Sequence, residues 1–138
     1  MASHAQLSMA LIVVGDLNAS VSFYTEVLGL EVADRNPTAA LLAGADRTPL
    51  ILRSMGASAA RAPGSAGVEF VYWAVNSEEA LDLAERALKR RSAYVETRHE
   101  DRYSVVEGRD PDGTPVLLAY PAPDQLPLRE LPVRIYAW

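Results

Sequence analysis

Few side chains in this sequence have the chemistry of an active site. The chain contains no cysteine, which excludes thiolate nucleophiles, thiolate metal ligands and disulfides together. Of its two histidines, His4 lies near the N-terminus, where we expect no role. His99 lies in the polar stretch RHEDR between two apolar segments. A solvated histidine is typical of such a turn, although His99 could also serve as an acid, a base or a hydrogen-bond donor.

The segment RYSVVEGRD, residues 102–110, carries the other candidates for acid–base chemistry. In a strand, alternate side chains share a face, so one face carries either Tyr103, Val105, Glu107 and Arg109 or their neighbours. The first set is the more polar and fits a surface that faces a ligand or solvent. Tyr103 and Glu107 therefore join His99 as candidate catalytic residues. No glycine-rich phosphate loop and no GxSxG motif accompanies them.

These residues must be positioned by strands and helices that recur along the chain. The first apolar strand, MALIVV, runs into a helix for which Asp16 and Asn18 are both plausible N-caps and Gly29 is the stop signal. The same order of strand, turn and helix returns in the second half, where Phe70 aligns with Met9. Asn-Pro at 36–37 and DPDG at 110–113 predict turns between further strands.

Each half therefore has the pattern β-α-β-β-β. We predict an α+β fold in which residues 1–138 form a single domain, with a first module at 7–54 and a second at 68–121. The segment between them, 55–67, is rich in Gly, Ala, Ser and Pro and is predicted to be a linker. Residues 122–138 form a C-terminal tail, whose apolar end we expect to pack across a partner subunit or to cover the ligand site.

The paired modules, the phrase VVGDLNASVSFYTEVLGLEV and the late RDPDGTPVLLAY resemble the vicinal oxygen chelate superfamily. This superfamily includes glyoxalase I, extradiol dioxygenases, fosfomycin-modifying enzymes and bleomycin-resistance proteins. The resemblance covers residues 7–121 and implies a cup-shaped mixed sheet with the helices on its outer face. It is specific for the fold but not for the function, since one fold hosts many activities.

In the metal-dependent members, four inward-facing positions supply His, Glu or Gln ligands to a divalent ion. The resemblance places these positions at Met9, Ile51, Phe70 and Leu117, all of which are apolar. Such side chains offer a divalent ion almost no donor, so we expect neither a metal nor another cofactor. A slip of one residue would bring Glu69 into the cup, but it would leave the first and last positions without a useful ligand.

What remains is an apolar and aromatic lining with a few polar groups, as is typical of a small-molecule pocket. We expect Phe70, Tyr72 and Trp138 to enclose a planar ring and Arg53 to pair with an acidic substituent. Alternatively, Met9 and Phe70 fill a cup that has closed. The residues predicted to bind the ligand are Met9, Leu11, Ile51, Arg53, Phe70, Tyr72, Tyr103, Glu107, Arg109, Leu117 and Trp138.

Three functions fit this lining. The first is a metal-free protein that sequesters a hydrophobic or aromatic natural product, similar to the bleomycin-resistance branch, as a homodimer with its sites at the subunit interface. The second is a metal-independent enzyme that acts on a polyketide-like or aromatic substrate through Glu107, His99 or Tyr103. The third is a metal-dependent lyase or dioxygenase whose ligands lie at other positions.

Composition excludes several other classes. The net charge is −5. The one dense basic run, Lys89 to Arg91, lies at the C-terminal end of a predicted helix, where positive charges interact favourably with the negative end of the helix dipole. We therefore do not interpret this run as a nucleic-acid-binding site. No apolar run reaches the length of about 18 residues that a membrane span needs. The first residues lack the basic and apolar regions of a signal peptide, so we expect a cytoplasmic protein.

Overall fold

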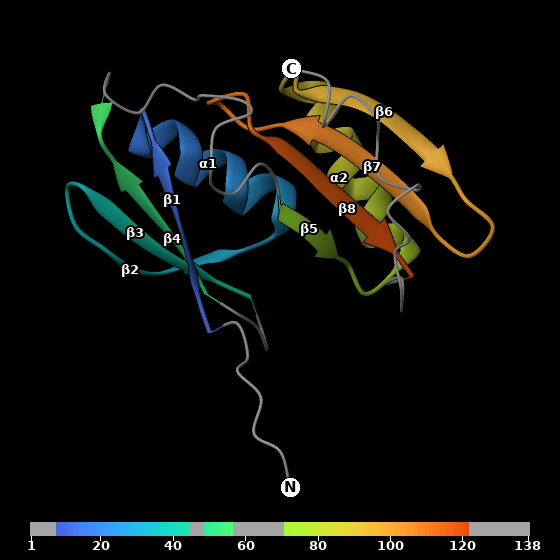
Figure 1. Ribbon diagram of the computed structural model, residues 1–138, viewed down its shortest axis with the longest axis horizontal. Helices are drawn as coiled ribbons and strands as arrows, with labels where there is room; N and C mark the ends of the chain where they lie inside the picture. Colours follow the sequence, from blue (N-terminus) through green and yellow to red (C-terminus); the bar gives the residue numbers. More distant parts are fainter. Residues whose placement is uncertain (1–7, 45–48, 57–70, 122–138) are drawn as a thin grey trace, which may run out of the picture. The chain divides into compact units, whose positions relative to one another are not determined.

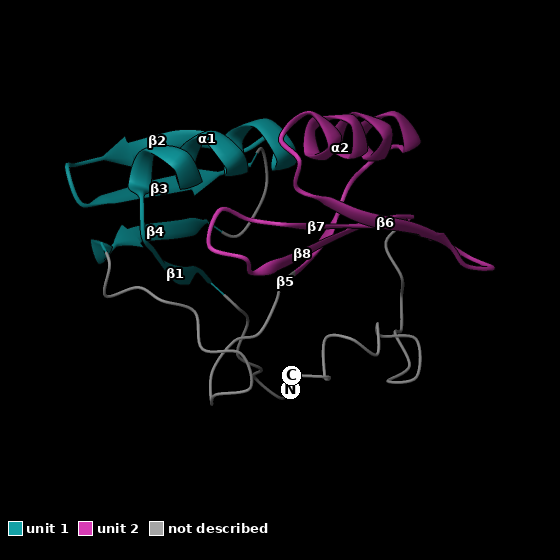
Figure 2. Cartoon of the chain, turned by 90° about the horizontal axis from the view of Figure 1, so that it is seen from above, with its two compact units in different colours: residues 1–60 teal, residues 61–138 magenta. Residues whose placement is uncertain are grey.

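The computed structural model describes residues 8–44, 49–56 and 71–121 (Figure 1). The chain divides into two compact units, Met1–Ala60 and Arg61–Trp138 (Figure 2). Within each unit, a four-stranded mixed sheet carries one helix on one of its faces (Figure 2). Among the described residues, no helix is long and apolar enough to cross a membrane.

The first unit has the strand order β1-β4-β3-β2. The first strand, β1, runs parallel to β4, and the remaining neighbours are antiparallel. Its elements are β1 (Ala10–Val14), α1 (Leu17–Leu28), β2 (Glu31–Arg35), β3 (Ala39–Ala43) and β4 (Leu50–Ser54).

The second unit repeats this topology with the order β5-β8-β7-β6, and again only the first pair, β5 and β8, is parallel. The two β-α-β-β-β modules confirm the predicted α+β fold. The elements are β5 (Val71–Ala74), α2 (Glu78–Arg90), β6 (Tyr94–His99), β7 (Ser104–Arg109) and β8 (Pro115–Tyr120).

The helix ends follow from local chemistry. Asp16, not Asn18, caps α1, since its carboxylate accepts the backbone N–H of Ala19 at 3.1 Å. Gly29 ends the helix with φ of 69°, a left-handed conformation that glycine adopts without steric cost. Ser77 caps α2 in the same way, accepting from the N–H of Ala80 at 3.0 Å.

The predicted turns are also held by side chains. Asn36 Oδ1 accepts the N–H groups of Thr38 and Ala39, both at 2.9 Å. Asp110 Oδ1 accepts the N–H groups of Asp112 and Thr114, which closes the hairpin between β7 and β8. These short loops fix the register of the strands that they join.

Each helix covers one face of its sheet. Phe23 and Tyr24 of α1 are buried with their rings edge to face at 5.2 Å, and Leu52 of β4 is also buried. In the second unit, α2 approaches β7 so closely that Gly108 leaves no room for a Cβ beside Leu88. In the described part of each unit, no helix lies on the opposite face of the sheet, and this helix-free face is where the sequence placed the ligand (Figure 2).

Candidate functional site

The helix-free face of the first sheet is apolar and open to water. Pairing across the strands aligns Leu11 with Ile51 and Leu41, and aligns Val13 with Arg53 and Ala39. These residues alternate with buried ones that face α1, and Met9 continues the alternation just before β1. The sequence therefore predicted correctly which side chains of β1 and β4 share this face, which includes Met9, Leu11, Ile51 and Arg53.

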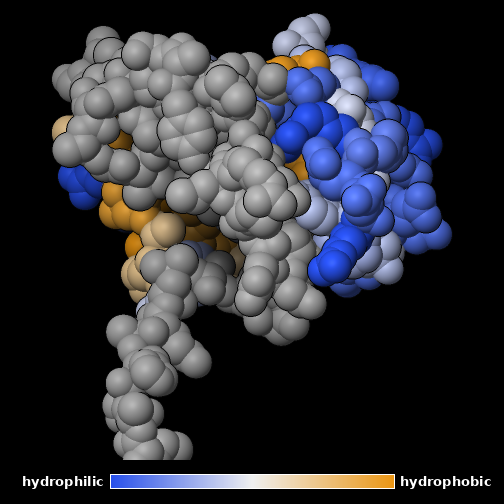
Figure 3. Space-filling model, turned by 45° about the vertical axis from the view of Figure 1, so that its right-hand side comes forward, coloured by the Kyte–Doolittle hydropathy of each residue, from blue (hydrophilic) through white to orange (hydrophobic). Residues whose placement is uncertain are grey.

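Exposure distinguishes this face from the rest of the unit. The exposed fractions of Met9, Leu11 and Val13 are 50 %, 54 % and 45 %, whereas Val14, which faces the helix, is fully buried. The space-filling view shows a hydrophobic patch beside the grey segments, and the surface on the right is mostly hydrophilic (Figure 3). A contiguous exposed apolar patch is typical of a surface that binds something.

The helix-free face of the second sheet has the composition that alternation predicts. Pairing aligns Tyr72 with Leu117 and Glu107, and aligns Ala74 with Ala119 and Val105. Tyr103, Val105, Leu117 and Ala119 form one buried cluster against which Tyr72 packs. This resolves the choice left open for β7, because Tyr103, Val105, Glu107 and Arg109 share the face of Leu117. Unlike its counterpart in the first unit, this face is buried along β7 and β8, although Ala74 of β5 is exposed.

Glu107 is the one acidic side chain buried within this apolar face, with an exposed fraction of 1 %. Its Oε2 lies 3.7 Å from a guanidinium nitrogen of Arg109. Arg109, which is partly exposed, also donates to the carbonyl oxygen of Gly113 at 3.4 Å. A carboxylate buried among apolar side chains needs a positively charged partner. Arg109, the last residue of β7, provides this charge.

His99 lies on the other side of the second sheet from Glu107. It is the last residue of β6, not part of the turn as the sequence suggested, because its backbone still pairs with Ser104. Its Nδ1 lies 2.9 Å from Ser104 Oγ, and its side chain is exposed. In this arrangement, His99 and Glu107 cannot form an acid–base pair on one substrate, since the sheet separates them.

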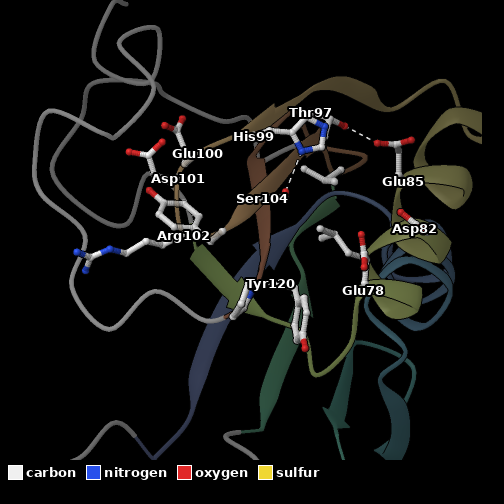
Figure 4. A pocket seen from close by; sticks show the side chains of 14 residues that line it. Glu78, Asp82, Glu85, Thr97, His99, Glu100, Asp101, Arg102, Ser104 and Tyr120 are labelled. Atoms are coloured by element: carbon white, nitrogen blue, oxygen red, sulfur yellow. Dashed lines mark hydrogen bonds between the residues drawn. The ribbon is translucent and has the colours of Figure 1, made fainter.

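His99 instead lines a hollow of about 510 Å³ between α2 and the ends of β6, β7 and β8 (Figure 4). Its wall is strongly acidic, and Tyr103 reaches it from the start of β7. Spacings of four and three residues put Glu78, Asp82 and Glu85 on one face of α2, a signal present in the sequence that our prediction did not use. The lining is Glu78, Leu81, Asp82, Glu85, Thr97, His99, Glu100, Asp101, Arg102, Tyr103, Ser104, Val106, Tyr120 and Pro121.

A short polar chain fixes one wall of this hollow. The Thr97 hydroxyl donates to Glu85 (Figure 4). Tyr94 Oη lies 2.8 Å from the Thr97 hydroxyl oxygen. The hydrogen bond from Thr97 holds the pKa of the Glu85 carboxyl below its usual value, and Lys89, at 3.2 Å, lowers this pKa further. Glu85 is therefore a fixed negative charge at neutral pH.

The positions at which the resemblance implies metal ligands do not fit a metal in this chain. Met9 is half exposed, Ile51 lies beside Leu11, and Leu117 is fully buried in the apolar cluster. Thioether and alkyl groups at these positions cannot replace the oxygen and imidazole donors that a divalent ion requires. Glu107, one strand away from Leu117, is already paired with Arg109. Nowhere in the described part of the chain do three His, Asp or Glu residues gather as a metal site would require.

Two of the predicted binding residues, Phe70 and Trp138, lie outside the described residues, as do Glu69, most of the predicted linker and the whole tail. Their part in the site stays a prediction.

Comparison with known families identifies the class of this protein. The model of the Glyoxalase/Bleomycin resistance protein/Dioxygenase superfamily matches residues 6–118. The chain therefore belongs to this superfamily, as the motifs in its sequence indicated. No match was found among curated proteins.

Solved structures show the same fold at low sequence identity. A glyoxalase/bleomycin resistance protein/dioxygenase domain from Frankia sp. EAN1pec is 22% identical with a TM-score of 0.74, covering 85% of this chain and 92% of that one. A protein of the same description from Nocardioides is 23% identical with a TM-score of 0.62, covering 92% and 93%. The fosfomycin resistance protein FosX from Mesorhizobium loti is 10% identical with a TM-score of 0.66, covering 85% and 92%. Similarity at such low sequence identity supports a shared fold but not a shared activity.

Proposed function

We propose that this protein binds a small hydrophobic or aromatic molecule without a metal, on the helix-free face of its first sheet. The observation that carries the proposal is the row of half-exposed apolar side chains, Met9, Leu11 and Val13, along β1. Covering apolar surface contributes roughly 25 cal/mol per Å², so a flat ring laid on this strand would gain affinity from area alone. The polar groups at the site would then orient it.

The role that best fits such a site is sequestration of a natural product, as in the bleomycin-resistance branch. The superfamily description names resistance proteins, and one structural relative is a fosfomycin resistance protein. An apolar sheet face can hold a ligand without changing it, which is all that sequestration requires. We propose a homodimer whose second copy completes the site, since one open face encloses a ligand on one side only.

A metal-independent enzyme is the second candidate that the sequence raised, and the geometry favours it less. Glu107 and Tyr103 share one face, which would suit acid–base chemistry, but both are closed to water in this structure. A substrate would reach Glu107 only after the face had opened, whereas Tyr103 also lines the acidic hollow. His99, the remaining candidate, lies on the opposite side of the sheet.

Thermal-shift screening of the full chain against aromatic natural products tests the proposal. A ligand that binds only the folded state at 100 times its Kd adds about 2.7 kcal/mol to the free energy of unfolding and raises Tm by several degrees. Leu11→Gln should abolish this shift, because it places an amide on the binding face. Leu83→Gln is the matched control, since Leu83 on α2 is 60 % exposed and lies in the second unit.

Two results would contradict the proposal. One is a ligand whose Tm shift survives Leu11→Gln but is lost with a substitution on the second sheet. The other is the absence of any shift in a screen that includes planar aromatic, macrocyclic and glycopeptide compounds. Recovery of a chemically altered ligand after incubation would favour the enzyme instead.

A further inference from the structure

Among the described residues, Arg53 is the one cation on the open face of the first sheet. Arg53 of β4 pairs in register with Val13 on one side and Ala39 on the other, so its side chain starts from an apolar row. Ile51, two residues earlier on the same face, and Leu11 beside it extend that surface. Arg53 itself is exposed.

Within the described part of the chain, Arg53 forms no hydrogen bond and no ion pair. The acidic residues in register on this face belong to the edge strand β2, where Asp34 aligns with Leu41 of β3 and Glu31 aligns with Ala43 of β3. Asp34 accepts the backbone N–H of Arg35 at 2.8 Å. Arg35 and Arg86 differ from Arg53, since Arg35 is hydrogen-bonded to Asn18, and Arg86 donates to the carbonyl oxygen of Asp82 at 3.4 Å.

From this placement, we propose that the ligand is an aromatic or apolar acid whose anionic group is bound by Arg53. This inference rests on the proposed function and specifies the chemical class of the ligand for the same face. A guanidinium has five N–H donors in a planar fork that matches a carboxylate in a two-bond arrangement. When a ring covers the neighbouring apolar row, it removes water from this fork and strengthens the pair. The protein's net charge of −5 opposes an anionic ligand, so the attraction has to be local to Arg53.

A matched pair of probes separates charge from apolar contact. Fluorescence titration would compare 2-naphthoate with 2-naphthamide, which share a ring system and differ in charge. We expect naphthoate to bind about fivefold more tightly than the amide, the size of one partly exposed ion pair. Raising the salt concentration to 0.5 M should reduce this preference, because exposed charges are screened.

Variants of Arg53 then test whether this residue causes the preference for naphthoate over naphthamide. Arg53→Gln should bring the naphthoate-to-naphthamide ratio to about one. Arg53→Lys should retain part of the ratio, since it keeps the charge and loses the fork. Arg86→Gln removes an exposed arginine from α2 and should leave the ratio unaltered. The Tm of each unliganded variant should stay near that of the parent, as is usual for surface substitutions.

The outcomes distinguish this inference from the function on which it rests. If both probes bind equally, or if Arg53→Gln leaves the ratio intact, the choice of an acid is wrong and the apolar site stands. If neither probe binds, both proposals fail together. A change in the oligomeric state of Leu11→Gln, measured by light scattering, would then show that the face serves only as an interface between copies.

Discussion

Leu117 and Glu107 lie opposite each other on neighbouring strands, and the contrast between them defines the chemistry of the second sheet. Leu117 stands where the resemblance implies a metal-ligating side chain. Leucine has no atom that binds a metal, and this side chain is fully buried. The carboxylate one strand away is engaged by Arg109. A charge buried in an apolar face is costly unless paired, so we interpret this ion pair as part of the fold.

A stability prediction at the residue scale concerns Gly108. A Cβ at this position would lie 2.4 Å from Leu88 Cδ2 and 2.8 Å from the carbonyl oxygen of Ala93. The backbone oxygen cannot move aside as a side chain can, so Gly108→Ala should lower the free energy of unfolding by about 3 kcal/mol. Urea denaturation followed by circular dichroism measures this loss.

Gly29→Ala is the matched control for Gly108→Ala. No atom lies within 4 Å of its added Cβ, and only the positive φ opposes the substitution. We expect a loss of about 1 kcal/mol. Equal losses in the two variants would show that the close approach of α2 to β7 does not limit this position.

At the scale of elements, the hydrogen bond between Thr97 of β6 and Glu85 of α2 joins a helix to its sheet. This hydrogen bond lowers the pKa of the Glu85 carboxyl in the folded state. It therefore contributes fully to the free energy of unfolding when the pH is above the pKa that Glu85 has in the unfolded chain. The contribution is lost as the pH falls through the lower pKa of the folded state. Thr97→Val removes the hydroxyl and should raise this pKa towards its usual value. Carboxyl NMR titration of Glu85 measures the shift directly.

Thr25→Val provides the control for this experiment. The Thr25 hydroxyl donates to the carbonyl oxygen of Val21 at 2.8 Å within α1 and does not contact Glu85. The titration of Glu85 should be the same in this variant as in the parent. If Thr97→Val leaves the pKa of Glu85 unchanged, then Lys89 and not the hydrogen bond sets it.

The sequence predicted the elements well because their signals are local. Asp16, Gly29 and Asn36 act on backbone groups within four residues. The resemblance placed Met9 and Ile51 on the inward face, and alternation then added Leu11 to that face. Alternation could not predict that this face is open while the face of Leu117 is closed, since exposure depends on what packs against a strand. The acidic hollow was missed because it combines α2 with three strand ends.

At the scale of the whole molecule, the C-terminal tail remains a prediction, since it lies outside the described residues. Its last part, LPVRIYAW, carries Val133, Ile135 and Trp138, which are unfavourable in water. Deleting Leu131 to Trp138 should weaken dimerisation or ligand binding, measured by sedimentation and by calorimetry on the same preparation. If neither changes, the tail has no part in the site.

The central claim is that a small molecule lies on the helix-free face of the first sheet. Methyl NMR of the full chain during titration with 2-naphthamide tests it most directly, because each Leu, Ile and Val methyl reports its own surroundings. We predict that the methyl signals of Leu11, Val13 and Ile51 shift together and saturate at one Kd, while those of Leu83 and Leu88 on α2 stay in place. Shifts confined to the second unit, or no saturable shift at Leu11, would contradict the account.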